Sequence, residues 1–186
     1  MPGVLEAGPL RLDRWQLDDV DDILEAVRSS FAELQQWMHW AQTMPTRDEQ
    51  HESLASGITA FDAGTDFGFG IRETASGALV GGAGLHRRDS SAAEIGYWIR
   101  SDRQRRGYAT RATEAMTDAA FTYLADVELV EIHMDRANVA SAGVPEKLGY
   151  RLVRNEPIEQ RALAHTGEGS VWEQRRDEWT SRRATS

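Results

Sequence analysis

The chain has 186 residues, of which 40% are apolar and 27% are charged, a balance typical of a folded rather than a disordered protein. It contains no cysteine, which excludes disulfide bonds, thiolate catalysis and Cys-ligated metal. The formal net charge of -9 disfavours nucleic-acid partners, and no apolar run approaches the roughly 20 residues of a membrane helix. The N-terminus lacks a signal-peptide pattern, so we expect a cytoplasmic protein without nucleic-acid or membrane partners.

The first third of the chain predicts one strand followed by three helices. Alternating apolar residues indicate a strand at residues 10–15, and apolar residues at helical spacing indicate one helix at residues 20–31 and a second at residues 34–41. A third helix is expected after Thr46, because Thr46 and Glu49 form a capping-box pattern.

The rest of the chain is rich in strands. On the long helix expected at residues 109–124, Ala112, Met116 and Tyr123 are predicted to face inward. We expect residues 1–180 to form a single domain and residues 181–186 a frayed tail. This order of elements predicts a mixed α/β (α+β) fold. The expected strands are residues 67–72, 79–86, 94–99, 129–134, 150–154 and 170–174, and the expected helices are residues 109–124 and 140–147.

A basic loop joins the strand expected at residues 94–99 to the long helix expected at residues 109–124. Arg100, Arg105 and Arg106 precede Gly107, after which the helix begins. A helix N-terminus presents unpaired N–H groups and the positive end of the helix dipole, and a glycine lets a phosphate approach the backbone closely. The loop therefore indicates a pyrophosphate site, with an exposed arginine-rich turn as the alternative. It is neither a Walker A loop nor a dinucleotide fingerprint, because the required spacings are missing.

Three segments resemble the GNAT acyltransferase superfamily. Residues 104–109 match its Gln/Arg-x-x-Gly-x-Gly/Ala motif, which binds the pyrophosphate of coenzyme A. Residues 94–99 resemble the preceding strand in the RimJ/RimL branch, the N-terminal acetyltransferases of ribosomal proteins and their relatives. Residues 138–141 and 146–150 resemble the family's Asn-x-x-Ser helix and its exit into a strand. The resemblance extends from about residue 10 to residue 179.

The resemblance implies a fold, a reaction and a set of cofactor-binding residues. The fold is a GNAT-like mixed, mostly antiparallel sheet of six to seven strands flanked by helices. The reaction transfers an acetyl group from acetyl-CoA to a primary amine, without a metal, by direct attack on the thioester. Asn138 alternatively caps its helix, and Lys147 is alternatively a solvated surface residue. The implied cofactor-binding residues are Trp98, Ile99, Arg100, Gln104, Arg105, Arg106, Gly107, Tyr108, Ala109, Thr110, Asn138, Ser141 and Lys147.

The resemblance also implies catalytic residues. Ser141 is the expected proton donor to the departing sulfur, with a helix-capping role as the alternative. Glu94 shares strand parity with Gly96 and Trp98, so it is either the general base or an edge carboxylate paired with an arginine. His86 is the second candidate base. Pro145 lies inside the helix that carries Ser141, where the missing N–H and a clash with the Ser141 carbonyl predict a kink.

The acceptor amine is less well defined by the sequence. Trp37 and Trp40, with Glu94, are expected to bind it, although such tryptophans are also common in cores. Weak candidate bases favour an α-amino group with a pKa near 8 over a lysine with a pKa near 10.4. A longer donor such as succinyl-CoA, an antibiotic or polyamine acceptor, and a non-catalytic acyl-CoA sensor are the alternatives. A homodimer is a family-level expectation, and the histidines show no metal-ligand spacing.

Overall fold

The computed structural model describes residues 1–183, and within them eight strands form one sheet in the order β1-β2-β3-β4-β5-β6-β8-β7. Neighbouring strands are antiparallel except for β5 and β6, which are parallel. The strands are β1 (Val4–Ala7), β2 (Leu10–Arg14), β3 (Asp66–Glu73), β4 (Leu79–Arg87), β5 (Ala92–Ile99), β6 (Leu129–Asp135), β7 (Arg151–Pro157) and β8 (Glu168–Arg175).

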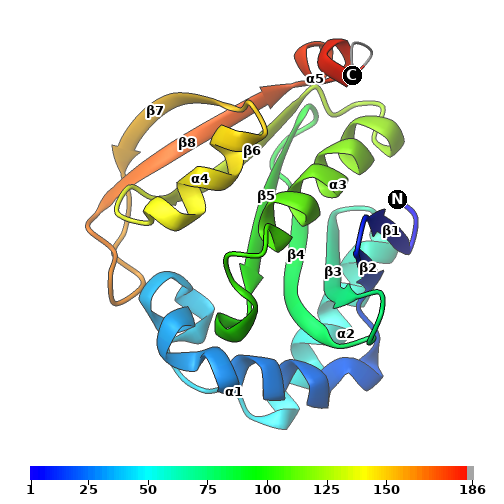
Figure 1. Cartoon of the computed structure of the whole chain (residues 1–186), viewed down its shortest axis with the longest axis vertical. Helices are drawn as coiled ribbons and strands as arrows, with labels where there is room; N and C mark the ends of the chain where they lie inside the picture. The colour runs from blue at the N-terminus through cyan, green and yellow to red at the C-terminus, as the bar shows by residue number, and fades with distance from the viewer. Residues whose placement is uncertain (184–186) are drawn as a thin grey trace.

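Helices cover both faces of this sheet. Figure 1 shows α3 and α4 in front of the sheet, α2 behind it and α1 across its lower end. The α-helices are α1 (Val20–Trp37), α2 (Arg47–Ala63), α3 (Tyr108–Tyr123), α4 (Val139–Lys147) and α5 (Arg176–Arg183), and the short 3-10 helices are η1 (Leu17–Asp19), η2 (His39–Ala41) and η3 (Ser101–Arg103).

The predicted mixed, mostly antiparallel sheet is confirmed, with one strand more than expected. The seven expected strands correspond to β2 through β8, and β1 is the addition. It has only four residues, of which Leu5 and Ala7 are buried, and it turns into β2 at Gly8, whose φ is 69°. An alternating pattern of four residues is too short to identify a strand in a sequence. The strand is stable because it pairs with β2, and this pairing is not visible in the sequence.

The two helices predicted at residues 20–31 and 34–41 are one helix, which is a correction. Phe31 and Leu34 are three residues apart, so the apolar stripe of α1 continues without a break. The helix ends where Met38 adopts an extended conformation, with φ -102° and ψ 115°. Trp40 therefore lies in η2 and not on the same helix as Trp37.

Two further expectations are wrong, and one capping pattern is confirmed. Tyr123 is 54% exposed because α3 ends there, beyond the part that packs on the sheet. Residues 181–183 are helical within α5 instead of frayed, and residues 184–186 lie outside the described part of the chain. At the start of α2 the Thr46 hydroxyl accepts from the Glu49 N–H at 3.3 Å and the Glu49 carboxylate accepts from the Thr46 N–H at 2.8 Å.

Two apolar clusters hold the layers together. The larger lies between the sheet and α3, where Phe69, Leu85, Ile95 and Met116 are fully or almost fully buried. Each such side chain stabilises the fold by roughly 1.5–3 kcal/mol relative to exposure. The smaller cluster joins α1 to Leu79, the first residue of β4. The second cluster positions α1 beside the face of β4 and β5 that carries the site.

Candidate active site

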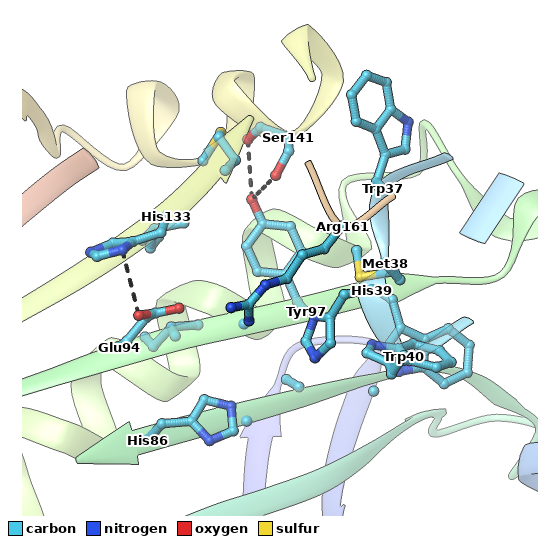
Figure 2. A pocket seen from close by; sticks show the side chains of 18 of the residues that line it. Trp37, Met38, His39, Trp40, His86, Glu94, Tyr97, His133, Ser141 and Arg161 are labelled. Carbon is cyan, nitrogen blue, oxygen red and sulfur yellow. Dashed lines mark hydrogen bonds and ion pairs between the residues drawn. The ribbon is translucent and has the colours of Figure 1, made fainter. Parts of the chain in front are cut away.

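A cleft of about 1140 Å³ lies along β4 and β5. Its walls come from α1, η2 and α2 on one side and from β6, α4 and the segment between β7 and β8 on the other. Figure 2 shows Trp37 and Trp40 on one side of Tyr97, and His86 and Glu94 on its other side.

The cleft opens where β5 and β6 separate. These two strands pair over only three residues, from Ala92 and Leu129 to Glu94 and Glu131, although β5 continues to Ile99. The Arg100 N–H donates to the Val80 carbonyl of β4 at 2.8 Å. Because N–H groups alternate sides along a strand, the N–H of Ile99 points into the gap. This separation leaves a free backbone edge that suits an extended amide-containing ligand.

The N-terminus of α3 follows β5 in the chain, after the short helix η3. Gly107 is the N-cap with φ 76°, no side chain caps the helix, and a Cβ placed on Gly107 would meet no atom within 4 Å. The first N–H groups of a helix have no partner within it, so those of Tyr108, Ala109 and Thr110 are available to an anion. Arg105 also has a positive φ of 60°. These residues fit the diphosphate of coenzyme A.

Carboxylates engage part of the basic loop, which the sequence does not reveal. The Arg100 guanidinium bonds to Glu25 at 3.1 Å and to Asp102, so two carboxylates already engage it. Glu73 accepts from the Tyr108 hydroxyl at 2.7 Å. That hydrogen bond, with nearby Arg103, holds the pKa of Glu73 below its ordinary value. Gln104, Arg105 and Arg106 are exposed, and Arg106 lies 3.9 Å from Glu73.

The start of α4 presents Asn138 and Ser141 to the cleft. The Asn138 side chain caps the helix by accepting from the Ser141 N–H at 3.1 Å, which agrees with the capping alternative. The Ser141 hydroxyl lies 3.0 Å from the Tyr97 hydroxyl, as Figure 2 shows. Helix α4 continues through Pro145 to Lys147, which is exposed and has no ion pair among the described residues.

A row of ionisable side chains crosses four neighbouring strands, from β3 to β6. Asp66 pairs with His86, His86 with Glu94, and Glu94 with Glu131, so all four side chains share one face of the sheet. His86 and Glu94 of this row were predicted from the sequence. Asp66 and Glu131 belong to it only because the sheet order places β3 and β6 beside β4 and β5.

His86 and Glu94 differ in how they are engaged. The Nδ1 atom of His86 lies 2.6 Å from the Asp66 carboxylate, which raises the pKa of His86. Its Nε2 atom lies over Gly84 and Gly96, in the cleft. Glu94 instead forms an ion pair with Arg88, the alternative noted from its sequence position, and lies 3.6 Å from His133.

The remaining walls are aromatic or come from a distant segment. Trp40 meets Trp98 edge to face with ring centroids 6.0 Å apart, and both line the cleft with Trp37. Residues 158–167, between β7 and β8, form a strap across the cleft. Backbone N–H groups of this strap donate to carbonyls at the end of α1, and His165 bonds to the Trp37 carbonyl at 3.2 Å.

The floor of the cleft is made of glycine backbone. A Cβ on Gly70 would lie 2.5 Å from the Trp15 ring, and one on Gly82 would lie 2.6 Å from Trp98 Nε1. The two indole rings therefore lie flat on the sheet, which needs residues without side chains there.

Sequence reasoning missed four contributors to the cleft: Asp66, Tyr97, His133 and the strap. Tyr97 has the opposite strand parity to Glu94, which gave no signal that it lines the cleft. Asp66 and His133 gain a role only through pairing between strands. Among the residues described, no three His, Asp or Glu side chains are grouped to hold a metal ion, and no helix is long and apolar enough to cross a membrane.

Comparison with protein families decides the class. Residues 9–151 match the model of the acetyltransferase (GNAT) domain. The chain belongs to this family. This GNAT protein is accordingly an acetyl-CoA-dependent N-acetyltransferase, and the implied family is confirmed.

Individual relatives place this acetyltransferase near the RimJ/RimL branch. YdaF of Bacillus subtilis (strain 168), whose name is that of a ribosomal N-acetyltransferase, is 26% identical, with 71% of this chain and 72% of that protein covered. RimL, a ribosomal L7/L12 alpha-N-protein acetyltransferase solved with coenzyme A, superposes with a TM-score of 0.86 at 18% identity over 94% and 99% of the two chains. The enzyme from Salmonella typhimurium that modifies the N-terminal serine of L7/L12 superposes with a TM-score of 0.80 at 18% identity. The superposition covers 92% of this chain and 98% of that chain.

Proposed function

We propose that this enzyme acetylates the α-amino group of a peptide or protein N-terminus. The observation that carries the proposal is the Asp66–His86 pair, which presents an imidazole nitrogen to the cleft. Relatives named for the acetylation of ribosomal-protein N-termini support the same acceptor class.

His86 is the better of the two candidate bases. The Asp66 carboxylate accepts from Nδ1–H, which leaves Nε2 of the neutral ring with a free lone pair. The Glu94 carboxylate is already engaged by the Arg88 guanidinium, so it is not free to approach the amine. We assign His86 as the base that takes a proton from the amine, directly or through a water, and Asp66 as the group that orients it.

The chemical demands select an α-amine over a lysine. An α-ammonium group has an ordinary pKa near 8, which a histidine near neutrality can match, whereas a lysine side chain with a pKa near 10.4 is about two hundredfold less available as the free amine. A base matched to the acceptor transfers its proton most efficiently. The raised pKa of His86 therefore fits an α-amino acceptor.

The chain's residues divide the reaction between two ends of the cleft. The amine nitrogen forms its bond to the acetyl carbon as the carbon–sulfur bond breaks, and the electron pair of that bond stays on sulfur. His86 accepts the amine proton and later passes it to solvent, while the Ser141 hydroxyl donates a hydrogen bond to the leaving sulfur, which takes its proton from solvent. The N–H of Ile99 and the N-terminus of α3 hold the donor in place.

An acceptor panel tests this proposal. One peptide carries a free N-terminus and no lysine, and a second carries a blocked N-terminus and one lysine, with release of the coenzyme A thiol as the measurement. We expect kcat/KM to be at least about a hundredfold higher for the free N-terminus. A preference for the lysine peptide would contradict the acceptor class, and binding of acetyl-CoA without thiol release for any amine would indicate a sensor.

The same panel run with succinyl-CoA tests the donor. We propose that acetyl-CoA is the preferred donor and that residues 1–180 act as one catalytic unit, because the eight strands join a single sheet. Equal rates with succinyl-CoA would contradict the preference for acetyl groups.

A further inference from the structure

Helix α4 lacks one of its backbone hydrogen bonds at Ser141. In an α-helix the carbonyl of residue i accepts from the N–H of residue i+4, but the residue four positions after Ser141 is Pro145, which has no N–H. The Tyr97 hydroxyl donates to the Ser141 carbonyl at 3.1 Å instead. A side chain from β5 thus completes the helix at the residue that faces the cleft.

The same phenol reaches the Ser141 side chain. Tyr97 Oη lies 3.0 Å from Ser141 Oγ, so one hydroxyl contacts both oxygens of one residue (Figure 2). A carbonyl only accepts, while each hydroxyl has one proton to donate. When Tyr97 donates to the carbonyl, the serine proton points at Tyr97. When Tyr97 donates to Oγ, the serine proton is free for a group in the cleft.

We propose that Tyr97 is a positioning residue that holds the Ser141 hydroxyl in its rotamer and directs the serine proton toward the leaving sulfur. The inference rests on the proposed role of Ser141 and adds the residue that makes that role possible. Pro145 belongs to the same device, because the open Ser141 carbonyl holds Tyr97 Oη within reach of Ser141 Oγ, to which Tyr97 donates when the sulfur is bound.

Tyr97 orients a proton but does not supply one. Burial raises the pKa of Tyr97 to about 12, whereas a thiol has an ordinary pKa near 8.5. The phenol therefore stays neutral beside a thiolate, and its effect reaches the sulfur through Ser141. A hydrogen bond donated to a thiolate favours the ionised sulfur, so the bound thiol should have a lowered pKa.

The pKa of bound coenzyme A thiol provides a direct test without turnover. Thiolate absorbance is titrated against pH in the complexes of coenzyme A with the unaltered enzyme and with Tyr97→Phe and Ser141→Ala. We expect Ser141→Ala to raise this pKa by about one unit and Tyr97→Phe to raise it nearly as much. An unchanged thiol pKa in Tyr97→Phe would overturn the proposal.

Kinetics separate positioning from structural support. We expect kcat to fall about tenfold in Tyr97→Phe and in Ser141→Ala, with KM for acetyl-CoA within about twofold. The double variant should fall no further than Ser141→Ala alone, because Tyr97 acts through Ser141. Additive losses would show that Tyr97 acts elsewhere.

Pro145→Ala distinguishes the two contacts of Tyr97. Alanine returns an N–H that can bond to the Ser141 carbonyl, so adding it to Tyr97→Phe should recover melting temperature but not kcat. Recovery of kcat would show that Tyr97 only completes the helix and would overturn the proposal. If the unaltered enzyme acetylates no amine, the proposed function fails instead.

Tyr150→Phe is the matched control. Tyr150 is also buried, and its hydroxyl bonds to Thr117 at 2.6 Å and not to Ser141. The same loss of a phenol oxygen should lower the melting temperature while leaving kcat and the thiol pKa unchanged. A fall in kcat as large as that in Tyr97→Phe would attribute the effect to stability and contradict positioning.

Discussion

The two ends of the cleft are built in different ways. At the donor end the free edge of β5 and the N-terminus of α3 present main-chain groups from one continuous segment, residues 95–110. At the acceptor end the side chains come from α1, η2, β3, β4, β5, β6 and the strap. A short motif therefore indicates the donor site, whereas the acceptor site exists only after these segments have been brought together.

This difference explains which features of the site carry specificity. Backbone N–H groups bind a diphosphate whatever side chains surround them, since the ligand is charged and constant. The acceptor end discriminates through particular side chains, such as the imidazole of His86 and the ring of Trp40. Variants at the donor end should alter cofactor affinity, and variants at the acceptor end should alter rate and choice of amine.

The largest effect is expected at the donor end. Gly107→Glu places a carboxylate where the diphosphate is held, and we expect affinity for acetyl-CoA to fall more than about a hundredfold, close to 3 kcal/mol, in a calorimetric titration. Gly64→Glu is the matched control, because Gly64 has φ 72° and open space around its missing Cβ but caps α2 away from this loop. Equal losses in both variants would point to backbone strain rather than to the phosphate site.

The next effect is expected from the base. His86→Gln should lower kcat/KM about a hundredfold, because a positioned base contributes about that much. Acetyl-CoA affinity should be unchanged, which a calorimetric titration would check. Retention of full activity would remove His86 from the mechanism and return Glu94 to first place.

Asp66→Asn sharpens the same assignment through pH. A base acts when it is neutral, so activity should rise with pH through the pKa of His86. Because Asp66 raises that pKa, the rise in activity should move to lower pH in Asp66→Asn, and a profile of kcat/KM against pH would measure the shift.

The Asp66–His86 pair also stabilises the folded state while His86 is protonated. This stabilisation is complete below the pKa of His86 in the unfolded chain, near 6.5, and is lost as pH rises through its pKa in the folded protein.

A smaller effect is expected from the aromatic wall. Trp40→Ala removes a partly exposed ring, and we expect KM for a peptide acceptor to rise about fivefold, close to 1 kcal/mol, while KM for acetyl-CoA stays constant. Steady-state kinetics with each substrate varied in turn would check this. A change confined to acetyl-CoA would place Trp40 at the donor end.

The smallest effect is expected for Arg100. Its guanidinium is held by Glu25 and Asp102, so Arg100→Gln should change acetyl-CoA affinity by less than about twofold. Arg105→Gln, which removes a guanidinium that bonds to no carboxylate in the described structure, is the comparison. A larger loss from Arg100 than from Arg105 would show that the ion pairs rearrange on binding.

The contrast also shows how far sequence reasoning reaches. The capping box at Thr46 and the turn at Gly107 were predictable because each depends on residues a few positions apart. The continuity of α1 and the exposure of Tyr123 were mispredicted because helix ends depend on where packing stops. Nothing in the neighbourhood of Tyr97 along the chain indicates that it meets Ser141, 44 positions later.

The sequence by itself determined the family, the mixed sheet and the location of the cofactor loop, because periodicity and short motifs record local backbone geometry. Tertiary structure alone decided that His86 contacts Asp66 and that Glu94 forms an ion pair with Arg88. It also decided that the Tyr97 hydroxyl donates to the Ser141 carbonyl in place of the N–H that Pro145 lacks. The reason is physical: side-chain hydrogen bonds act over about 3 Å, and only strand order and helix packing bring distant residues within that reach.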